Sequence, residues 1–217
     1  MLFSRPARLL DPAETLPGRD EPIRPPEQHE VTGRPMTPPW PDGHEVLVLG
    51  MGCFWGAERL YWSLPGVWTT AVGYAGGTTP NPTYEEVCSG RTNHAEVVLV
   101  VYDPQAADLE DLLAVFWENH DPTQRMGQGN DVGTQYRSII LSTTSAQQEA
   151  ALASRERYQR RLEAAGFGEI ATEVTDPEAL VDGLPTTWGY AEGYHQQYLE
   201  KHPGGYCNHG FCQVAYS

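Results

Sequence analysis

The chain has 217 residues, with 14 basic against 29 acidic side chains and a formal charge of −15. This balance excludes nucleic acid and anionic membrane surfaces as expected partners, because their phosphates would repel the protein. No apolar run approaches the roughly 20 residues of a membrane span, and the N-terminus lacks the continuous apolar stretch of a signal peptide. We therefore expect a cytoplasmic monomer, in which the 4 cysteines serve catalysis, redox chemistry, metal binding or simple packing rather than a disulfide framework.

Residues 1–44 form a proline-rich N-terminal extension. Ten of the 18 prolines lie here, so this segment can hold neither a long helix nor a central strand. Scattered apolar residues such as Met36 and Trp40 predict that the arm is anchored to the domain that follows.

The first strand is predicted at Val46–Leu49, which is uniformly apolar and too short for a helix. A helix is predicted from Cys53 to Trp62, and it ends before Leu64-Pro65-Gly66. Further strands are expected at residues 69–74, 96–102, 137–141 and 169–175.

Two longer helices are predicted in the second half of the chain. Residues 108–119 carry apolar side chains at the spacing of one buried helical face. Residues 145–165 open with the capping-box spacing Ser145 to Gln148, and a shorter helix is expected at 195–202. Mixed strands and helices indicate an α+β fold, a two-layer α/β sandwich with a mixed, partly rolled, ferredoxin-like sheet. The main domain is assigned to residues 45–202 and a coil-rich tail to 203–217.

Cys53 lies between the first strand and the helix, in the stretch Gly52-Cys53-Phe54-Trp55-Gly56. A free cysteine is often a small buried hydrophobe. At a helix N-terminus, however, unpaired N–H groups favour a thiolate, the nucleophilic form. Phe54 and Trp55 are either core residues or walls of a small apolar pocket, and adjacent helix positions diverge by about 100°, so both cannot point into one face of the core.

Two further clusters carry acids and phenols. Glu96 stands at the mouth of an apolar strand, where it is either a solvated strand end or a general acid with a raised pKa. Asp131 and Tyr136 lie in a glycine-marked loop, residues 129–138, that is either an ordinary turn or a source of hydrogen bonds. Cys88 is expected to be a packed thiol in a short helix.

The tail reads Gly204-Gly205-Tyr206-Cys207-Asn208-His209-Gly210-Phe211-Cys212. Its two cysteines can approach each other and a distant nucleophile on a flexible, glycine-rich segment. Alternatively, Cys207, His209 and Cys212, with His202 or His195, supply zinc-type ligands, although the spacing matches no paired zinc framework.

The motifs GCFWG, GYAGG, NPTYEEVCSG, NHAEVV, FWENHDPTQ, GNDVGTQYRS, YHQQYL and GGYC together resemble the type A methionine sulfoxide reductases, the peptide-methionine (S)-S-oxide reductases. The likeness runs from about Gly50 to Cys207, and the arm resembles the extension of the bacterial long form. Two segments depart from the family pattern. Cys212 follows Cys207 after a shorter spacer than in many long-form relatives. Residues 186–189 differ from the aromatic-rich segment that is common in the family at this place.

The resemblance implies a role for each matching residue. Cys53 would be the nucleophile and Glu96 the acid that protonates the sulfoxide oxygen, with Tyr84, Tyr136 and Asp131 as hydrogen-bonding partners. The substrate's methyl group would bind Phe54 and Trp55, and Tyr190 and Tyr206 would also line the site. Cys207 and Cys212 would be the recycling cysteines.

The implied activity is reduction of the S epimer of methionine sulfoxide, in proteins and as the free amino acid. It proceeds through a sulfenic acid and a disulfide that thioredoxin reduces, with no metal or organic cofactor. Two rival functions use some of the same residues. One is a zinc-binding interaction module built on the tail, and the other is a thiol peroxidase.

Overall fold

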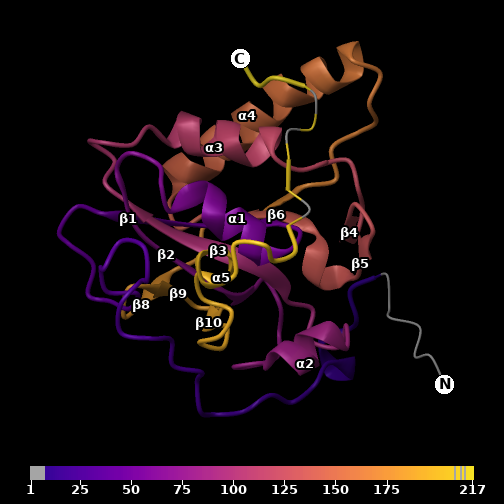
Figure 1. Ribbon diagram of the computed structural model, residues 1–217. Helices are drawn as coiled ribbons and strands as arrows, with labels where there is room; N and C mark the ends of the chain where they lie inside the picture. The colour runs from indigo at the N-terminus through magenta and orange to yellow at the C-terminus, as the bar shows by residue number, and fades with distance from the viewer. Residues whose placement is uncertain (1–7, 208, 211, 213) are drawn as a thin grey trace.

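A six-stranded mixed sheet organises the protein, as seen in the computed structural model, which describes residues 8–207, 209, 210, 212 and 214–217 (Figure 1). The strand order is β10-β2-β3-β1-β6-β7, and only the β6–β7 pair is parallel. The strands are β1 (Glu45–Met51), β2 (Val67–Ala75), β3 (Ala95–Tyr102), β6 (Ser138–Leu141), β7 (Glu173–Val174) and β10 (Gly189–Tyr190). Two small hairpins pair β4 (Gly127–Gln128) with β5 (Asp131–Val132) and β8 (Leu180–Val181) with β9 (Leu184–Pro185).

The helices are α1 (Phe54–Tyr61), α2 (Tyr84–Cys88), α3 (Leu109–Glu118), α4 (Ser145–Ala164) and α5 (Tyr198–Lys201), with short 3-10 turns η1 (Pro12–Glu14) and η2 (Thr134–Tyr136). α1, α3 and α4 lie together on one face of the sheet (Figure 1). Within the described residues, no helix has both the length and the apolar character needed to cross a membrane.

The two faces of the sheet bury different clusters. Val98, Val100 and Tyr102 of β3 point into the main core beneath α1, α3 and α4. The alternate residues Val97 and Leu99 belong to a second cluster on the opposite face, where the packed side chains include Trp40, Trp68, Leu184 and Trp188. All of β3 is buried, because helices cover one face and the arm and loops cover the other. The predicted α+β fold with a mixed sheet is confirmed.

The proline-rich arm packs along the domain surface, as the apolar residues within it predicted. Met36 is fully buried with Ala71 and Tyr190. His29 Nε2 lies 2.9 Å from Thr70 Oγ1 of β2, and the Arg34 guanidinium covers the Trp68 ring at 4.3 Å. The arm therefore reaches both faces of the sheet. Met36 packs with Ala71 on the face opposite the helices, whereas Thr70 lies on the helix side, where its hydroxyl also donates to Glu58 of α1.

Three predicted boundaries were wrong. The strand expected at 169–175 shrinks to Glu173–Val174, since only this stretch pairs with β6. The cap of α4 is Thr144, whose side chain accepts from the Gln147 N–H, one position before the predicted box. The helix expected at 195–202 begins only at Tyr198, because Gln197 has a left-handed backbone with φ 46°.

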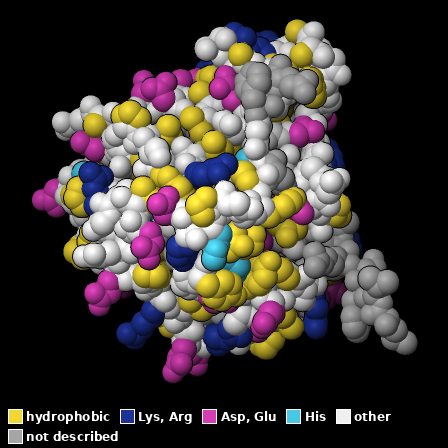
Figure 2. All heavy atoms as spheres, viewed as in Figure 1, with side chains coloured by type: hydrophobic (Ala, Val, Ile, Leu, Met, Phe, Trp, Pro, Cys, Tyr) yellow, Lys and Arg dark blue, Asp and Glu magenta, His cyan; other side chains and the backbone are white. Residues whose placement is uncertain are grey.

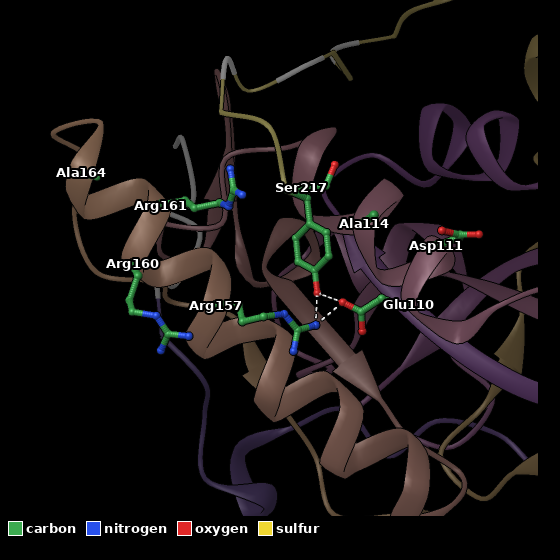
Figure 3. Close-up of a pocket in the computed structure, with 9 residues that line it drawn as sticks. Glu110, Asp111, Ala114, Arg157, Arg160, Arg161, Ala164 and Ser217 are labelled. Carbon is green, nitrogen blue, oxygen red and sulfur yellow. Dashed lines mark hydrogen bonds and ion pairs between the residues drawn. The ribbon is translucent and has the colours of Figure 1, made fainter.

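The C-terminal end of the chain packs on α3 and α4. Tyr216 stands beside a groove of about 710 Å³ between these helices, and its hydroxyl meets both Arg157 and Glu110 (Figure 3). Val214 and Tyr216 join the main core. This end of the chain is thus an integral part of the fold rather than a loose tail.

Candidate active site

Cys53 lies at the junction between β1 and α1, where the sequence predicted it. It is the N-cap residue of α1, and Gly52 before it has φ 96°, a conformation that favours glycine. A Cβ at Gly52 would also come 2.7 Å from the Gln128 side chain. The turn that presents the sulfur therefore depends on glycine. Cys53 is 6% exposed.

Glu96 lies at the beginning of β3, directly opposite Tyr74 of β2. Its side chain is on the face covered by α1, and its Oε2 accepts a hydrogen bond of 3.2 Å from the Phe54 N–H. Burial raises the pKa of this carboxyl to about 8, with a smaller upward contribution from Asp131, and the Phe54 N–H only partly opposes the rise. Glu96 is therefore largely protonated at neutral pH.

The prediction that the helix start would favour the Cys53 thiolate was wrong for the free protein. The N–H groups of Trp55 and Gly56 do favour the anion, but burial raises the pKa of the thiol well above its usual range. Glu96 and Asp131 add to this rise when they are charged. Desolvation outweighs the helix terminus because the sulfur has so little contact with water.

Three further polar side chains surround the sulfur and the carboxyl. Burial raises the pKa of both Tyr84 and Tyr136, and Glu96 raises each pKa further when its carboxyl is charged. Asp131 interacts with Glu96 and Tyr136, and its Oδ2 accepts a 3.0 Å hydrogen bond from Tyr206 of the tail. Protonated phenols and a neutral carboxyl thus converge beside Cys53, and each can donate a hydrogen bond.

Phe54 and Trp55 occupy different environments, as their angular separation on the helix predicted. Phe54 is 1% exposed and packs with Val72, Tyr74, Val87 and Ala191 in a small apolar cluster. Trp55 is only half-buried and stacks on Tyr198 with ring centroids 3.9 Å apart. Hydrophobic side chains gather around histidine on this face of the molecule, in the region of α2 and α5 (Figure 2).

His195 is a site residue for which the sequence offered only a zinc-ligand alternative. Its Nδ1 accepts a 3.1 Å hydrogen bond from the Trp55 indole N–H, and its ring lies 5.1 Å from Phe54 and 4.5 Å from Tyr84. Burial lowers the pKa of His195 to about 4, so the ring is neutral and Nδ1 can accept. Only the motif YHQQYL contained a signal for it.

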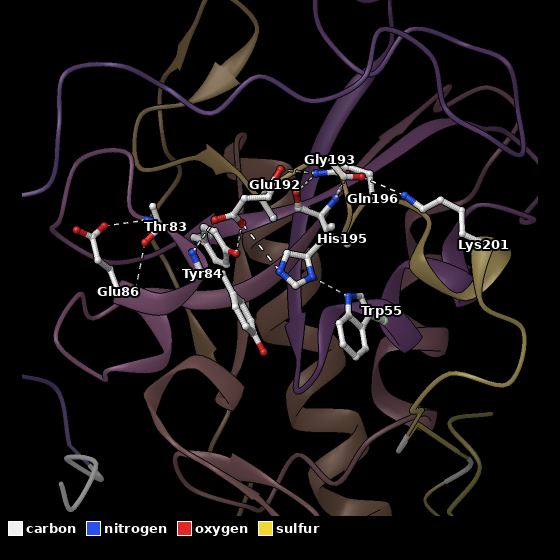
Figure 4. Close-up of polar contacts among 12 residues, drawn as sticks. Trp55, Thr83, Tyr84, Glu86, Glu192, Gly193, His195, Gln196 and Lys201 are labelled. Atoms are coloured by element: carbon white, nitrogen blue, oxygen red, sulfur yellow. Dashed lines mark hydrogen bonds and ion pairs between the residues drawn. The ribbon is translucent and has the colours of Figure 1, made fainter.

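Glu192 holds the same group of rings through its carboxylate, which lies beside His195 and Tyr84 (Figure 4). One carboxylate oxygen accepts from the Tyr84 backbone N–H at 2.9 Å, and the other accepts from the Tyr74 hydroxyl at 2.9 Å. It also lies 4.0 Å from His195 Nε2. The segment that follows β10 therefore fixes the aromatic residues that flank Cys53.

The tail lies across the start of α1 at Gly56. A Cβ on Gly56 would come 2.9 Å from Cys207 Sγ and 2.3 Å from His209 Nδ1, so glycine is what admits the tail. Arg59 of α1 donates to Cys207 Sγ at 3.4 Å. Since Cys53 Sγ faces the Gly56 N–H, the two sulfurs border the same residue.

Cys212 lies elsewhere. Its Sγ is 2.6 Å from the Tyr158 hydroxyl of α4 and 3.6 Å from the Trp117 carbonyl. The structure describes all four cysteines, and none of them forms a disulfide bond. Cys207, His209 and Cys212 thus face different partners, and among the described residues no three His, Cys, Asp or Glu side chains are arranged to hold a metal ion.

Tyr190 is not brought to the site. It pairs with Gly73 of β2 and packs with Met36 and Ala71, on the sheet face away from Cys53. Its hydroxyl donates to the Met36 carbonyl at 2.9 Å. This geometry assigns Tyr190 to holding the arm.

Comparisons with known proteins agree on one family. The family model described as "Peptide methionine sulfoxide reductase" matches residues 45–215. The peptide methionine sulfoxide reductase MsrA of Azotobacter vinelandii is 59% identical, over 93% of this chain and 90% of that protein. The corresponding Salinispora tropica protein is 61% identical, over 94% and 90%.

Solved structures give the same result. Methionine sulfoxide reductase A of Corynebacterium diphtheriae has a TM-score of 0.83 and 44% identity, over 95% of this chain and 99% of that one. Reduced Mxr1 of Saccharomyces cerevisiae has a TM-score of 0.69 and 34% identity, over 79% and 93%.

Proposed function

This chain belongs to the peptide methionine sulfoxide reductase family, and from that premise we propose that Cys53 reduces the S epimer of methionine sulfoxide, both in proteins and as the free amino acid. Because the chain belongs to this family, it is an enzyme that reduces methionine sulfoxide. The observation that carries the proposal is the protonated Glu96 carboxyl held against α1 beside the Cys53 thiol.

In the first step, Cys53 Sγ attacks the sulfoxide sulfur. The sulfoxide oxygen is a poor leaving group unless it gains a proton, which Glu96 supplies. Tyr84 and Tyr136 donate hydrogen bonds to the same oxygen, and Asp131 holds Tyr206 near it. The oxygen ends on Cys53 as a sulfenic acid and methionine leaves. The proton lost by the thiol restores Glu96, so no net proton is consumed.

The apolar part of the substrate binds beside the aromatic residues. Phe54 and Trp55 flank the sulfur and provide the wall for the methyl group, and His195 fixes the indole by its hydrogen bond. A small apolar wall next to a group of hydrogen-bond donors suits a methyl sulfoxide, which is polar on one side only. A peroxide has no methyl group to bind there.

Recycling requires the tail. Cys207 attacks the sulfenic acid, water leaves, and a Cys53–Cys207 disulfide forms. Cys212 then attacks Cys207, which moves the disulfide to the tail, where thioredoxin reduces it by exchange. Cys212 must leave Tyr158 for this step. The chemistry proposed here uses side chains of the chain and needs no organic cofactor or metal.

A thioredoxin-coupled assay on the two separated epimers of a methionine sulfoxide peptide tests the proposal. We expect turnover of the S epimer at least 100-fold faster than of the R epimer, and none with Cys53→Ser. Hydrogen peroxide, offered at equal concentration, discriminates the peroxidase alternative. Preference for peroxide, or turnover by the Cys53→Ser variant, would contradict the proposal.

A further inference from the structure

We propose that His209 is the base that takes the proton of the Cys207 thiol while Cys207 attacks the sulfenic acid on Cys53. This inference rests on the proposed resolving role of Cys207. It concerns the second chemical step, to which no residue has been assigned as a proton acceptor.

The first observation is the position of the ring. His209 Nδ1 and Cys207 Sγ both crowd the point where Gly56 would carry a Cβ, at 2.3 Å and 2.9 Å from it. They are therefore close neighbours over the first turn of α1. Cys53 Sγ faces the N–H of that same Gly56. The proton acceptor on His209, the attacking sulfur of Cys207 and the target sulfur of Cys53 therefore all lie around this one residue.

The second observation is the tautomer. His209 Nε2 lies 2.8 Å from the Met51 carbonyl, and a carbonyl can only accept, so Nε2 carries the hydrogen. The ring is neutral, because burial lowers the pKa of His209 to about 4. Nδ1 then holds a lone pair, and it is a buried nitrogen with no hydrogen-bond partner among the described residues. A buried polar atom left in this way calls for an explanation.

Arg59 is the charged group that acts on both Cys207 and His209. Arg59 donates to Cys207 Sγ at 3.4 Å and also lowers the pKa of His209. His120 and His209 interact as well, and burial lowers the pKa of His120 to about 3, so it is neutral too. In the free protein these conditions keep Nδ1 unprotonated. As negative charge develops on Cys207, Arg59 stabilises it and the adjacent Nδ1 can receive the proton.

The step balances. The Cys207 thiol gives its proton to His209 Nδ1, and its electron pair forms the S–S bond to Cys53. The S–O bond of the sulfenic acid breaks, and the leaving hydroxide takes a proton from Glu96 and departs as water. Cys207 is oxidised and Cys53 is reduced, and solvent carries the proton from His209 back to Glu96.

Two substitutions separate the base from a structural role. His209→Gln keeps an N–H that can reach the Met51 carbonyl but removes the basic nitrogen, because an amide cannot take up the thiol proton. His209→Ala removes the ring and leaves room for added imidazole. The full chain is reduced, mixed with a methionine sulfoxide peptide without thioredoxin, and quenched over time. Methionine is measured by chromatography, and the Cys53 sulfenic acid is trapped with dimedone and measured by mass spectrometry. His202→Gln, at an exposed histidine that ends α5 just before the tail, is the matched control.

We expect the first methionine to form within about twofold of the wild-type rate in both His209 variants. Disulfide formation should slow by about 10²-fold, the lower end for a general base, so that trapped sulfenic acid accumulates. Imidazole should restore the rate in His209→Ala only. Unchanged disulfide formation, or slowing that imidazole does not relieve, would overturn the proposal. A Cys207→Ser chain that still forms the Cys53 disulfide would instead show that the resolving role itself is wrong.

Discussion

The Glu96 carboxyl accepts a hydrogen bond of 3.2 Å, through Oε2, from the backbone N–H of Phe54, the residue next to Cys53. This bond links the beginning of β3 to the first turn of α1, and so fixes the distance between acid and nucleophile through two rigid elements. It also favours the charged form of the carboxyl, yet burial prevails and the pKa of Glu96 rises to about 8.

Glu96→Gln should therefore remove the acid while preserving an oxygen that accepts from Phe54. We expect single-turnover formation of methionine at pH 7 to fall by about 10²- to 10⁴-fold, as for a lost general acid. In the wild type, Glu96 is protonated below its pKa of about 8 and loses its proton as the pH rises, so the rate should decline through pH 8. A rapid-quench pH series checks both points, with Glu45→Gln, a carboxylate at the far end of β1, as control. A rate that is insensitive to the substitution would remove Glu96 from the chemistry.

Much of this arrangement could be predicted from the chain. The apolar run at Val46–Leu49 and the glycine that follows it were enough to place Cys53 at a strand-to-helix turn. The state of the thiol could not be predicted, because the burial that opposes the thiolate comes from residues distant in sequence. Tyr190 illustrates the same limit, since the sheet face on which it lies is set by its pairing with Gly73.

The aromatic wall depends on His195, which holds the Trp55 indole at 3.1 Å. His195→Ala should raise KM for a sulfoxide peptide about 5- to 10-fold, the worth of one hydrogen bond of about 1 kcal/mol, and leave kcat within twofold. Steady-state kinetics separate the two parameters, and His202→Ala, outside the hydrogen bond, serves for comparison. A fall in kcat with KM unchanged would instead place His195 in the chemical step.

Tyr190→Phe tests the side of the sheet on which this residue acts. The substitution removes only the hydroxyl that donates to the Met36 carbonyl at 2.9 Å. We expect the free energy of unfolding in urea to drop by about 1 kcal/mol, with KM unchanged, because the ring lies on the face away from Cys53. A raised KM at wild-type stability would return Tyr190 to the substrate site.

Gly56→Ala should slow formation of the Cys53–Cys207 disulfide without slowing formation of methionine. The new methyl group would meet Cys207 Sγ at 2.9 Å and His209 Nδ1 at 2.3 Å, so the tail must move away from α1. We expect the first methionine to form normally and the disulfide to form more than 10-fold slower, measured by thiol titration after one turnover. Gly204→Ala and Gly210→Ala, where a Cβ meets no atom within 4 Å, should change neither rate. Normal disulfide formation in Gly56→Ala would mean that Cys207 reacts from another position.

Cys212→Ser addresses the last transfer. In the free-thiol state its sulfur is 2.6 Å from the Tyr158 hydroxyl, on α4 and apart from the Gly56 turn. Removing it should leave both methionine formation and the Cys53–Cys207 disulfide intact, while thioredoxin-driven turnover slows, because the disulfide stays at the buried Cys53. Tyr158→Phe is the complementary variant, because it removes the hydroxyl that contacts Cys212 and keeps the Cys212 thiol. Thioredoxin-driven turnover of this variant should be at least as fast as that of the wild type. Wild-type turnover by Cys212→Ser would show that thioredoxin reduces the Cys53–Cys207 bond directly and that Cys212 is a packing residue.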